Sequence, residues 1–180
     1  MGGMGNWMVS NSNSSDQDAL IVSSTIIVIS QDMKALILKR LPTEKRFPNI
    51  WTVAGGKLKI YDGEKYSEGF YYYPAEEAAC RELEEETGIH ASYVRPKMKY
   101  LCSIVSLEAI KRLILSYYVY IPMNSNEIEI KTEDGQEYKW IYEHELYDYE
   151  FIVDIGGEIR KVFEILKEQR EEEIERILKS

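Results

Sequence analysis

The sequence has little of what marks several common classes of protein. Its 180 residues include only two cysteines, Cys80 and Cys102, which show no metal-ligand spacing and follow no signal peptide. We therefore expect two buried free thiols and a cytoplasmic protein. No apolar run approaches the roughly 18 residues of a membrane-spanning helix, and no internal repeat is present. Disulfide scaffolds, membrane anchoring and repeat architectures are therefore excluded.

Positive charge is also in short supply. Lysine and arginine number 22 against 31 aspartates and glutamates, for a formal net charge of −9. A surface of this sign repels phosphates unless a cation intervenes, so we expect no nucleic-acid polymer as partner. Any phosphate chemistry should need a bound metal. The hydrophobic share of 44% in a chain of this length is enough to build a core without disulfides or metals.

The residue patterns predict a tail followed by one domain. Residues 1–17 are rich in Gly, Ser and Asn and should form a flexible tail, so that the domain spans 18–180. β-branched and alternating residues predict strands at 19–30, 35–41, 50–54, 99–107, 111–122 and 137–142. Helical spacing predicts a helix from Pro74 to Thr87, ended by Gly88, and a long one over about 157–179. Helices flanking a central set of strands indicate an α+β fold with a mixed sheet.

The densest group of reactive side chains lies in the segment RELEEETGI, Arg81–Ile89. Glu82, Glu85 and Glu86 stand at i, i+3 and i+4 and therefore share one helical face. They repel one another near the partly negative end of the helix, so a cation is expected to offset them. Carboxylates and substrate phosphates are the usual ligands of Mg²⁺, with Mn²⁺ as the alternative. Runs of glutamate are also common on solvent-exposed helix faces, so this segment alone does not distinguish a metal site from an ordinary exposed surface.

The wider context resembles the signature of the Nudix hydrolase family, GX5EX7REUXEEXGU, where U is apolar. The second half matches at every fixed position: Arg81, Glu82, Leu83, Glu85, Glu86, Gly88 and Ile89. The order of elements over about 19–146 is similar too, including the WxxxGGK entry at Trp51 and the EYKWIYEHEL stretch. The resemblance implies a Nudix-like α/β/α sandwich with a mixed central β-sheet, a catalytic loop-helix and a long C-terminal helix.

The first half of the signature departs from the family pattern. Gly56 and Arg81 lie 25 positions apart where the signature has 14, which indicates an insertion of 11 residues. Asp62 stands where counting from Gly56 places the family's first Glu, so either Asp62 or Glu64 could substitute for it. The polar, tyrosine-rich segment 59–73 has no helical period, and we predict that it is a surface loop at the rim of the site that governs substrate choice.

The resemblance also implies roles for individual residues. Arg81 would join the helix to the preceding loop by an ion pair. The metal ligands would be the backbone carbonyl of Gly56 and the carboxylates of Glu82, Glu85 and Glu86. A carboxylate would serve as general base, and the candidates are Glu86, Glu133 and Glu137. Phosphates or a base could meet the side chains of Arg40, Lys57 and Tyr72, although each could be an ordinary surface residue.

The function implied is metal-dependent hydrolysis of a pyrophosphate bond in a nucleoside diphosphate linked to another moiety. The core begins near Ala19, without the long N-terminal strand region common in ADP-ribose hydrolases of the family. For this reason we favour a nucleoside triphosphate or dinucleoside polyphosphate as substrate, and ADP-ribose remains an alternative. The alternative is a catalytically silent nucleotide-binding or regulatory domain of the same fold. An isomerase is disfavoured because Cys80 lies on the core stripe of the helix.

The closing helix is longer than a small sheet needs for cover. Its apolar positions lapse over 169–173 and resume at Ile174, Ile177 and Leu178. The second half of this helix should therefore either overhang into solvent or meet a second copy in a homodimer.

Overall fold

A computed structural model describes residues 19–107, 110–132 and 135–179. The expected tail, residues 1–17, and the candidate base Glu133 lie outside these ranges. Within them, no helix is long and apolar enough to cross a membrane.

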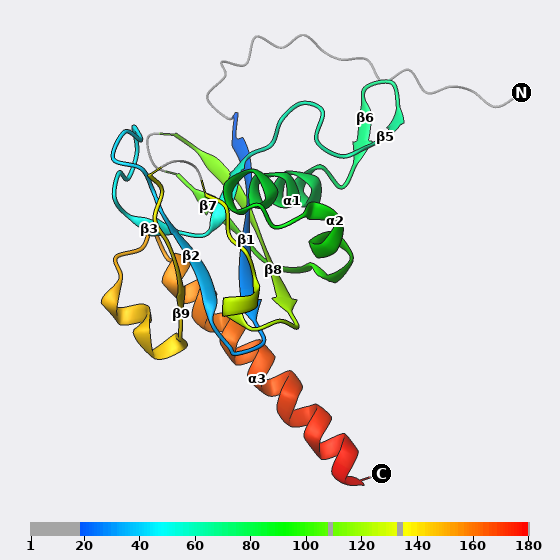
Figure 1. Ribbon diagram of the computed structural model, residues 1–180. Helices are drawn as coiled ribbons and strands as arrows, with labels where there is room; N and C mark the ends of the chain where they lie inside the picture. Colours follow the sequence, from blue (N-terminus) through cyan, green and yellow to red (C-terminus); the bar gives the residue numbers. More distant parts are fainter. Residues whose placement is uncertain (1–18, 108–109, 133–134, 180) are drawn as a thin grey trace, which may run out of the picture.

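A seven-stranded mixed sheet forms the centre of the molecule (Figure 1). Its main order is β3-β2-β1-β8-β7, with β4 paired to β1 and β9 paired to β2. β1 and β8 run parallel along their whole length, whereas the other pairs are antiparallel. The strands are β1 (Ile21–Ser30), β2 (Ala35–Lys39), β3 (Trp51–Thr52), β4 (Ala54–Lys57), β7 (Lys99–Ser106), β8 (Arg112–Ile121) and β9 (Tyr138–Ile141). The predicted strands are confirmed, except that the one at 50–54 is split into β3 and β4.

Two helices cover opposite faces of the sheet, α1 (Pro74–Thr87) and α3 (Ile155–Lys179). Along β1, Ile26 and Val28 pack in the core cluster of α1, while Ile27 and Ile29 pack in the cluster of α3. A strand buried on both faces has no polar alternation, which explains the continuous apolar run. The predicted α+β layout with a mixed sheet is therefore confirmed.

The helix ends follow the predicted signals closely. α1 has Pro74 at its first turn and ends at Gly88, whose φ of 73° lies in the left-handed region that glycine adopts without strain. α3 begins at Ile155, two residues earlier than predicted. The remaining short helices are α2 (Ala91–Val94), η2 (Arg95–Lys97), η3 (Ser125–Glu127) and η4 (Glu143–Asp148).

Both cysteines are free, as expected, but only one is fully buried. Cys80 lies on the buried face of α1, and burial raises the pKa of its thiol to about 11. A thiol in this state is a poor nucleophile. Cys102 on β7 is only partly buried, which corrects the expectation of two buried thiols.

The prediction of an irregular loop over 59–73 was wrong for most of that segment. β5 (Glu64–Ser67) and β6 (Phe70–Tyr72) form a separate two-stranded sheet that projects from the body near the start of α1 (Figure 1). Nearly all of its residues are exposed on both faces, so the sequence carries no apolar alternation to reveal the strands. The rings of Tyr66 and Tyr72 lie 4.9 Å apart across this hairpin, and such cross-strand pairs stabilise it.

Candidate active site

Two adjacent glycines on β4 let the sheet approach α1 closely. A Cβ atom on Gly55 would lie 2.5 Å from the carbonyl oxygen of Ser24 on β1, and one on Gly56 would lie 2.5 Å from Oε1 of Glu82. Both separations are shorter than real Cβ contacts. Glycine at position 55 therefore allows β4 to lie close to β1, and glycine at position 56 leaves room for the Glu82 carboxylate in its present position. The paired glycines thus form a cradle for one carboxylate of α1.

Three glutamates of α1 gather beside this cradle. The backbone N–H of Gly55 donates to Oε2 of Glu86 over 3.1 Å. Arg81 Nη1 donates to Glu82 Oε1 over 2.6 Å and to Glu85 Oε2 over 3.0 Å. Glu85, with half of its side chain exposed, also accepts from Lys59 Nζ over 3.2 Å. Glu84 points elsewhere, since its carboxylate accepts the backbone N–H of Ala91 over 2.8 Å.

Arg81 and Asp62 join the helix to the preceding loop. Arg81 Nε donates to Asp62 Oδ1 over 2.9 Å, and Nη2 donates to Asp62 Oδ2 and to the Lys57 carbonyl, each over 3.1 Å. The backbone N–H of Lys59 donates to Asp62 Oδ2 over 2.6 Å. Burial raises the pKa of the Asp62 carboxyl, but the hydrogen bonds from Arg81 and Lys59 outweigh burial and hold it below its usual range. The pair is therefore fully charged at neutral pH.

Asp62 and Glu64, the two candidates for the first Glu of the signature, make different contacts. Asp62 follows Gly56 by six positions, as that Glu would, and it contacts Arg81. Glu64 instead forms an ion pair with Arg95 over 2.7 Å. The spacing from Gly56 in the sequence already favoured Asp62. The sequence alone, however, did not show whether the insertion begins before or after this residue.

The insertion itself is the hairpin, residues 63–73. Its two ends meet, because a Cβ atom on Gly63 would lie 2.5 Å from the Tyr72 carbonyl oxygen and 3.3 Å from Cα of Pro74. The chain therefore leaves the signature at Gly63 and returns to almost the same point at Pro74. As a consequence, the 11 extra residues do not disturb the contact between Asp62 and Arg81.

The chemistry of this donor set fits a hard divalent cation. The carboxylates of Asp62, Glu82 and Glu85 share the two side-chain cations Lys59 and Arg81, and the Glu86 carboxylate lies beside them at the Gly55 N–H. Oxygen ligands of this type suit Mg²⁺ and Mn²⁺. In the arrangement described, however, no three acidic, histidine or cysteine side chains within residues 19–107, 110–132 and 135–179 converge as metal ligands. Glu85 would have to leave Lys59 and Arg81 to join the others.

Two of the predicted site residues, Arg40 and Glu137, form hydrogen bonds away from the acidic side chains of α1. Arg40 lies in the loop after β2, where its guanidinium donates to Glu44 over 2.8 Å and to the Arg46 carbonyl over 3.0 Å. Glu137 accepts from Lys39 Nζ over 2.8 Å.

Lys57 and Tyr72 lie on either side of the site. Lys57, at the end of β4, is exposed and adjacent to the cradle. Tyr72 is on the hairpin, at the other end of α1 from Glu85, and 11 residues of helix span about 16 Å. The hairpin is therefore placed beside the beginning of α1 and not over the carboxylates.

Comparison with solved structures shows a shared fold. A MutT protein from Methanosarcina mazei Go1 is 17% identical, with a TM-score of 0.62 over 85% of this chain and 99% of that one. The NUDIX domain of Shewanella oneidensis NrtR, complexed with ADP-ribose, is 16% identical, with a TM-score of 0.66 over 87% and 94%. An Ap4A hydrolase from C. elegans is 14% identical, with a TM-score of 0.59 over 82% and 98%.

These identities are low enough that the structural likeness shows the fold alone, and it confirms the Nudix fold that the signature predicted. No curated protein sequence matches the chain. The family model described as NUDIX domain matches residues 20–159, well over half of the sequence and including both the glycine cradle and the acidic face of α1. The chain belongs to the NUDIX domain family.

Proposed function

We propose that the protein is a metal-dependent hydrolase that cleaves a pyrophosphate bond in a nucleoside diphosphate linked to another moiety. One observation carries the proposal: Glu82 lies against Gly56 and Glu86 accepts the Gly55 N–H, while Arg81, which Asp62 fixes to the loop, binds both Glu82 and Glu85. An ordinary solvated helix face has no need of a glycine cradle or of a mostly buried ion pair beside it. The arrangement is therefore better explained by chemistry than by solubility.

A divalent cation would be held by Glu82, Glu85 and Glu86 together with the backbone carbonyl of Gly56. Mg²⁺ is favoured and Mn²⁺ is the alternative. When bound, such an ion neutralises charge on phosphate oxygens and lowers the pKa of a coordinated water. The gathering of carboxylate oxygens on this face of α1 supports this assignment, and in a protein of net charge −9 such an ion would reduce the repulsion of an anionic substrate.

Side chains of the protein itself supply the remaining contacts. Lys59 holds Glu85 in the structure, and its ammonium group would turn to a substrate phosphate once Glu85 has another partner. Lys57 stands next to it on the exposed end of β4 and is the second candidate for a phosphate contact. Arg40 stays a weaker candidate, because Glu44 and the Arg46 carbonyl already engage its guanidinium.

The general base is assigned among three glutamates. Glu86 is our first choice, because the Gly55 N–H fixes one of its oxygens and so sets the orientation of the carboxylate. Glu137 is the second candidate, and Lys39 Nζ contacts its carboxylate over 2.8 Å. Glu133, which lies outside the described residues, is the third candidate.

The substrate is a small nucleotide. We favour a nucleoside triphosphate or a dinucleoside polyphosphate, with ADP-ribose as the remaining option. The structural neighbours include a MutT protein, an Ap4A hydrolase and a NUDIX domain complexed with ADP-ribose, so they support nucleotides as a class and do not choose among them.

A catalytically silent nucleotide-binding domain is the second candidate. Glu85 forms ion pairs with Lys59 and Arg81, and a domain that does not bind a metal could use its carboxylate in this way. Against this stands the Asp62–Arg81 pair, which preserves the signature geometry in spite of the insertion.

A product-resolved substrate screen separates the two candidates. The purified chain is incubated with nucleoside triphosphates, Ap4A or ADP-ribose, each with Mg²⁺, Mn²⁺ or EDTA, and the products are separated by ion-exchange chromatography. The proposal predicts hydrolysis with either metal and none with EDTA. Binding of a nucleotide without any turnover in either metal would contradict it and support the silent domain.

A further inference from the structure

Apolar residues recur along one side of α3 in two groups, and Arg170 lies between them. Successive helical residues turn by about 100°, so Phe163, Leu166, Ile174 and Ile177 lie on one side. Phe163 and Leu166 pack against the core of the domain. Ile174 and Ile177 are 50% and 63% exposed, because this part of the helix projects beyond the sheet (Figure 1). The apolar stripe on this side of α3 is thus covered at Phe163 and Leu166 and exposed at Ile174 and Ile177.

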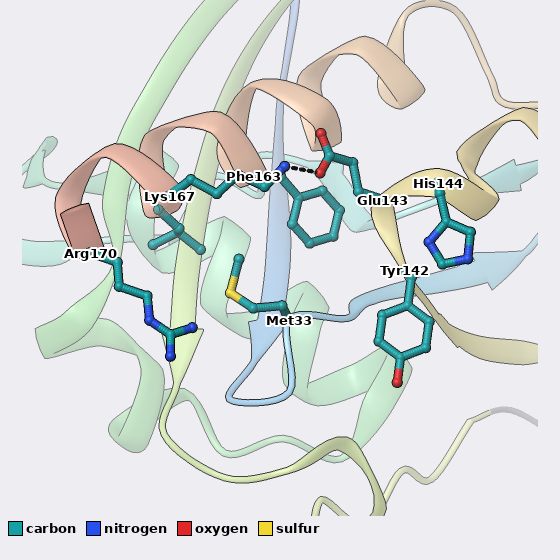
Figure 2. A pocket seen from close by; sticks show the side chains of 8 residues that line it. Met33, Tyr142, Glu143, His144, Phe163, Lys167 and Arg170 are labelled. Carbon is teal, nitrogen blue, oxygen red and sulfur yellow. Dashed lines mark hydrogen bonds and ion pairs between the residues drawn. The ribbon is translucent and has the colours of Figure 1, made fainter.

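A cavity of about 330 Å³ opens beside the covered part of this stripe (Figure 2). Met33, Phe163 and Leu166 give it an apolar floor, and the stacked rings of Tyr142 and His144 form a wall, with centroids 5.6 Å apart. The cavity is therefore suited to apolar side chains that arrive along α3.

The charges around the cavity and on the projecting helix are complementary. Lys167 and Arg170 stand at the cavity. The only acid among the cavity residues is Glu143, which is paired with Lys167. The projecting segment carries four acids, Glu171, Glu172, Glu173 and Glu175, and two cations. Arg176 pairs with Glu173 and Lys179 with Glu175, so the segment keeps a net negative charge.

We propose that the projecting segment of α3 is a self-association surface, in which residues 174–178 of a second copy lie antiparallel along α3 and fill this cavity. A two-fold axis beside Arg170 places Ile177 of the second copy opposite Phe163, and Ile174 of the second copy opposite Leu166. The same register places Glu173 of the second copy opposite Lys167. Because each chain offers both the cavity and the segment, the contact forms twice, as a symmetric dimer requires.

The arrangement leaves the candidate active site open. α3 covers one face of the sheet, whereas α1 with its acidic group lies on the other. The dimer and the hydrolase proposal are thus independent, and either can fail alone.

The first test is the mass of the intact chain in solution, measured by light scattering during gel filtration at micromolar concentration. We expect twice the chain mass of 21.0 kDa. The double variant Ile174→Asp/Ile177→Asp should be monomeric with unchanged circular dichroism, since both side chains are exposed in the monomer. A monomeric intact chain, or a dimer that persists in the double variant, would overturn the proposal.

The second test exchanges charges to probe the register. Lys167→Glu and Glu173→Lys should each raise the dimer dissociation constant by roughly ten-fold, and the combined exchange should restore most of the loss. Glu172→Lys is the matched control, because it lies half a turn away from the stripe and should change nothing. Failure of the combined exchange to restore the dimer would overturn the antiparallel register.

The third test removes residues 1–18, the other segment of this chain that could occupy the cavity. The dimer should be unaffected by this removal. An intact monomer that dimerises only after the removal would place that segment in the cavity and overturn the proposal.

Discussion

Removing the Asp62 carboxylate should destabilise the protein much more than removing that of Glu64, two positions along the chain. The side chains of Asp62 and Arg81 are 7% and 21% exposed, and two hydrogen bonds join them. Asp62→Ala leaves the guanidinium without its main partner and also removes the acceptor of the Lys59 N–H. The lowered pKa of Asp62 means that its stabilising contribution is present at pH 7, above the ordinary value of 3.8, and is lost only in acid.

The expected magnitude follows from these contacts. Removing one partner of a buried ion pair costs about 3–5 kcal/mol, and the partial solvent access of Arg81 reduces this to about 2–4 kcal/mol. For a domain of this size, the melting temperature should fall by roughly 4–16 °C. Asp62→Glu, which installs the residue of the family signature, should retain most of the stability.

Urea unfolding at pH 7, followed by circular dichroism, measures the change, and Glu64→Ala is the matched control. The Glu64 side chain is 57% exposed, and its partner Arg95 also contacts Glu77, so this variant should lose no more than about 1 kcal/mol. An Asp62→Ala variant within about 1 kcal/mol of the wild type would refute the reasoning, as would a larger loss for Glu64→Ala.

Three further predictions concern α3, the cradle and the hairpin. Burial raises the pKa of Glu158, so the charged form of this side chain lowers the stability of the fold, and the loss is recovered as the pH falls toward 4.5. Glu158→Gln should therefore be at least as stable as the wild type in urea unfolding at pH 8 and should lose this advantage at pH 5. A difference in stability that does not change with pH would contradict this prediction. Gly56→Ala should displace the Glu82 carboxylate and weaken metal-dependent turnover by about ten-fold or more with less than about 2 kcal/mol lost in stability, whereas unchanged rates would remove the cradle from the site. Deleting residues 64–73 should join Gly63 to Pro74 with the fold and turnover retained, and a folded but inactive variant would place a required group in the hairpin.

The sequence predicted the elements whose boundaries depend on single residues. Pro74 and Gly88 set the ends of α1, and the face shared by Glu82, Glu85 and Glu86 followed from helical spacing alone. These signals are local, so tertiary structure did not need to be known.

The sequence failed where the outcome depended on three-dimensional context. Both faces of the hairpin are exposed to solvent, so its strands show no alternation of apolar and polar residues in the sequence. Tyr72 was named as a substrate contact because of its aromatic character, although the predicted start of the helix at Pro74 already placed it at the opposite end of that helix from Glu85. The choice between Asp62 and Glu64 depended on where the insertion begins, which the contact with Arg81 shows.

The central claim is that the acidic face of α1 is a divalent-metal hydrolytic site. Its most direct test is the Mg²⁺ dependence of the initial rate on the best substrate for the wild type, Glu86→Gln and the control Glu84→Gln, which alters a glutamate of the same helix outside the cradle. We predict a saturable Mg²⁺ requirement in the wild type and in Glu84→Gln, and a loss of about 100-fold or more in Glu86→Gln with its fold retained. Wild-type rates in Glu86→Gln, or equal rates with Mg²⁺ and with EDTA, would contradict the claim.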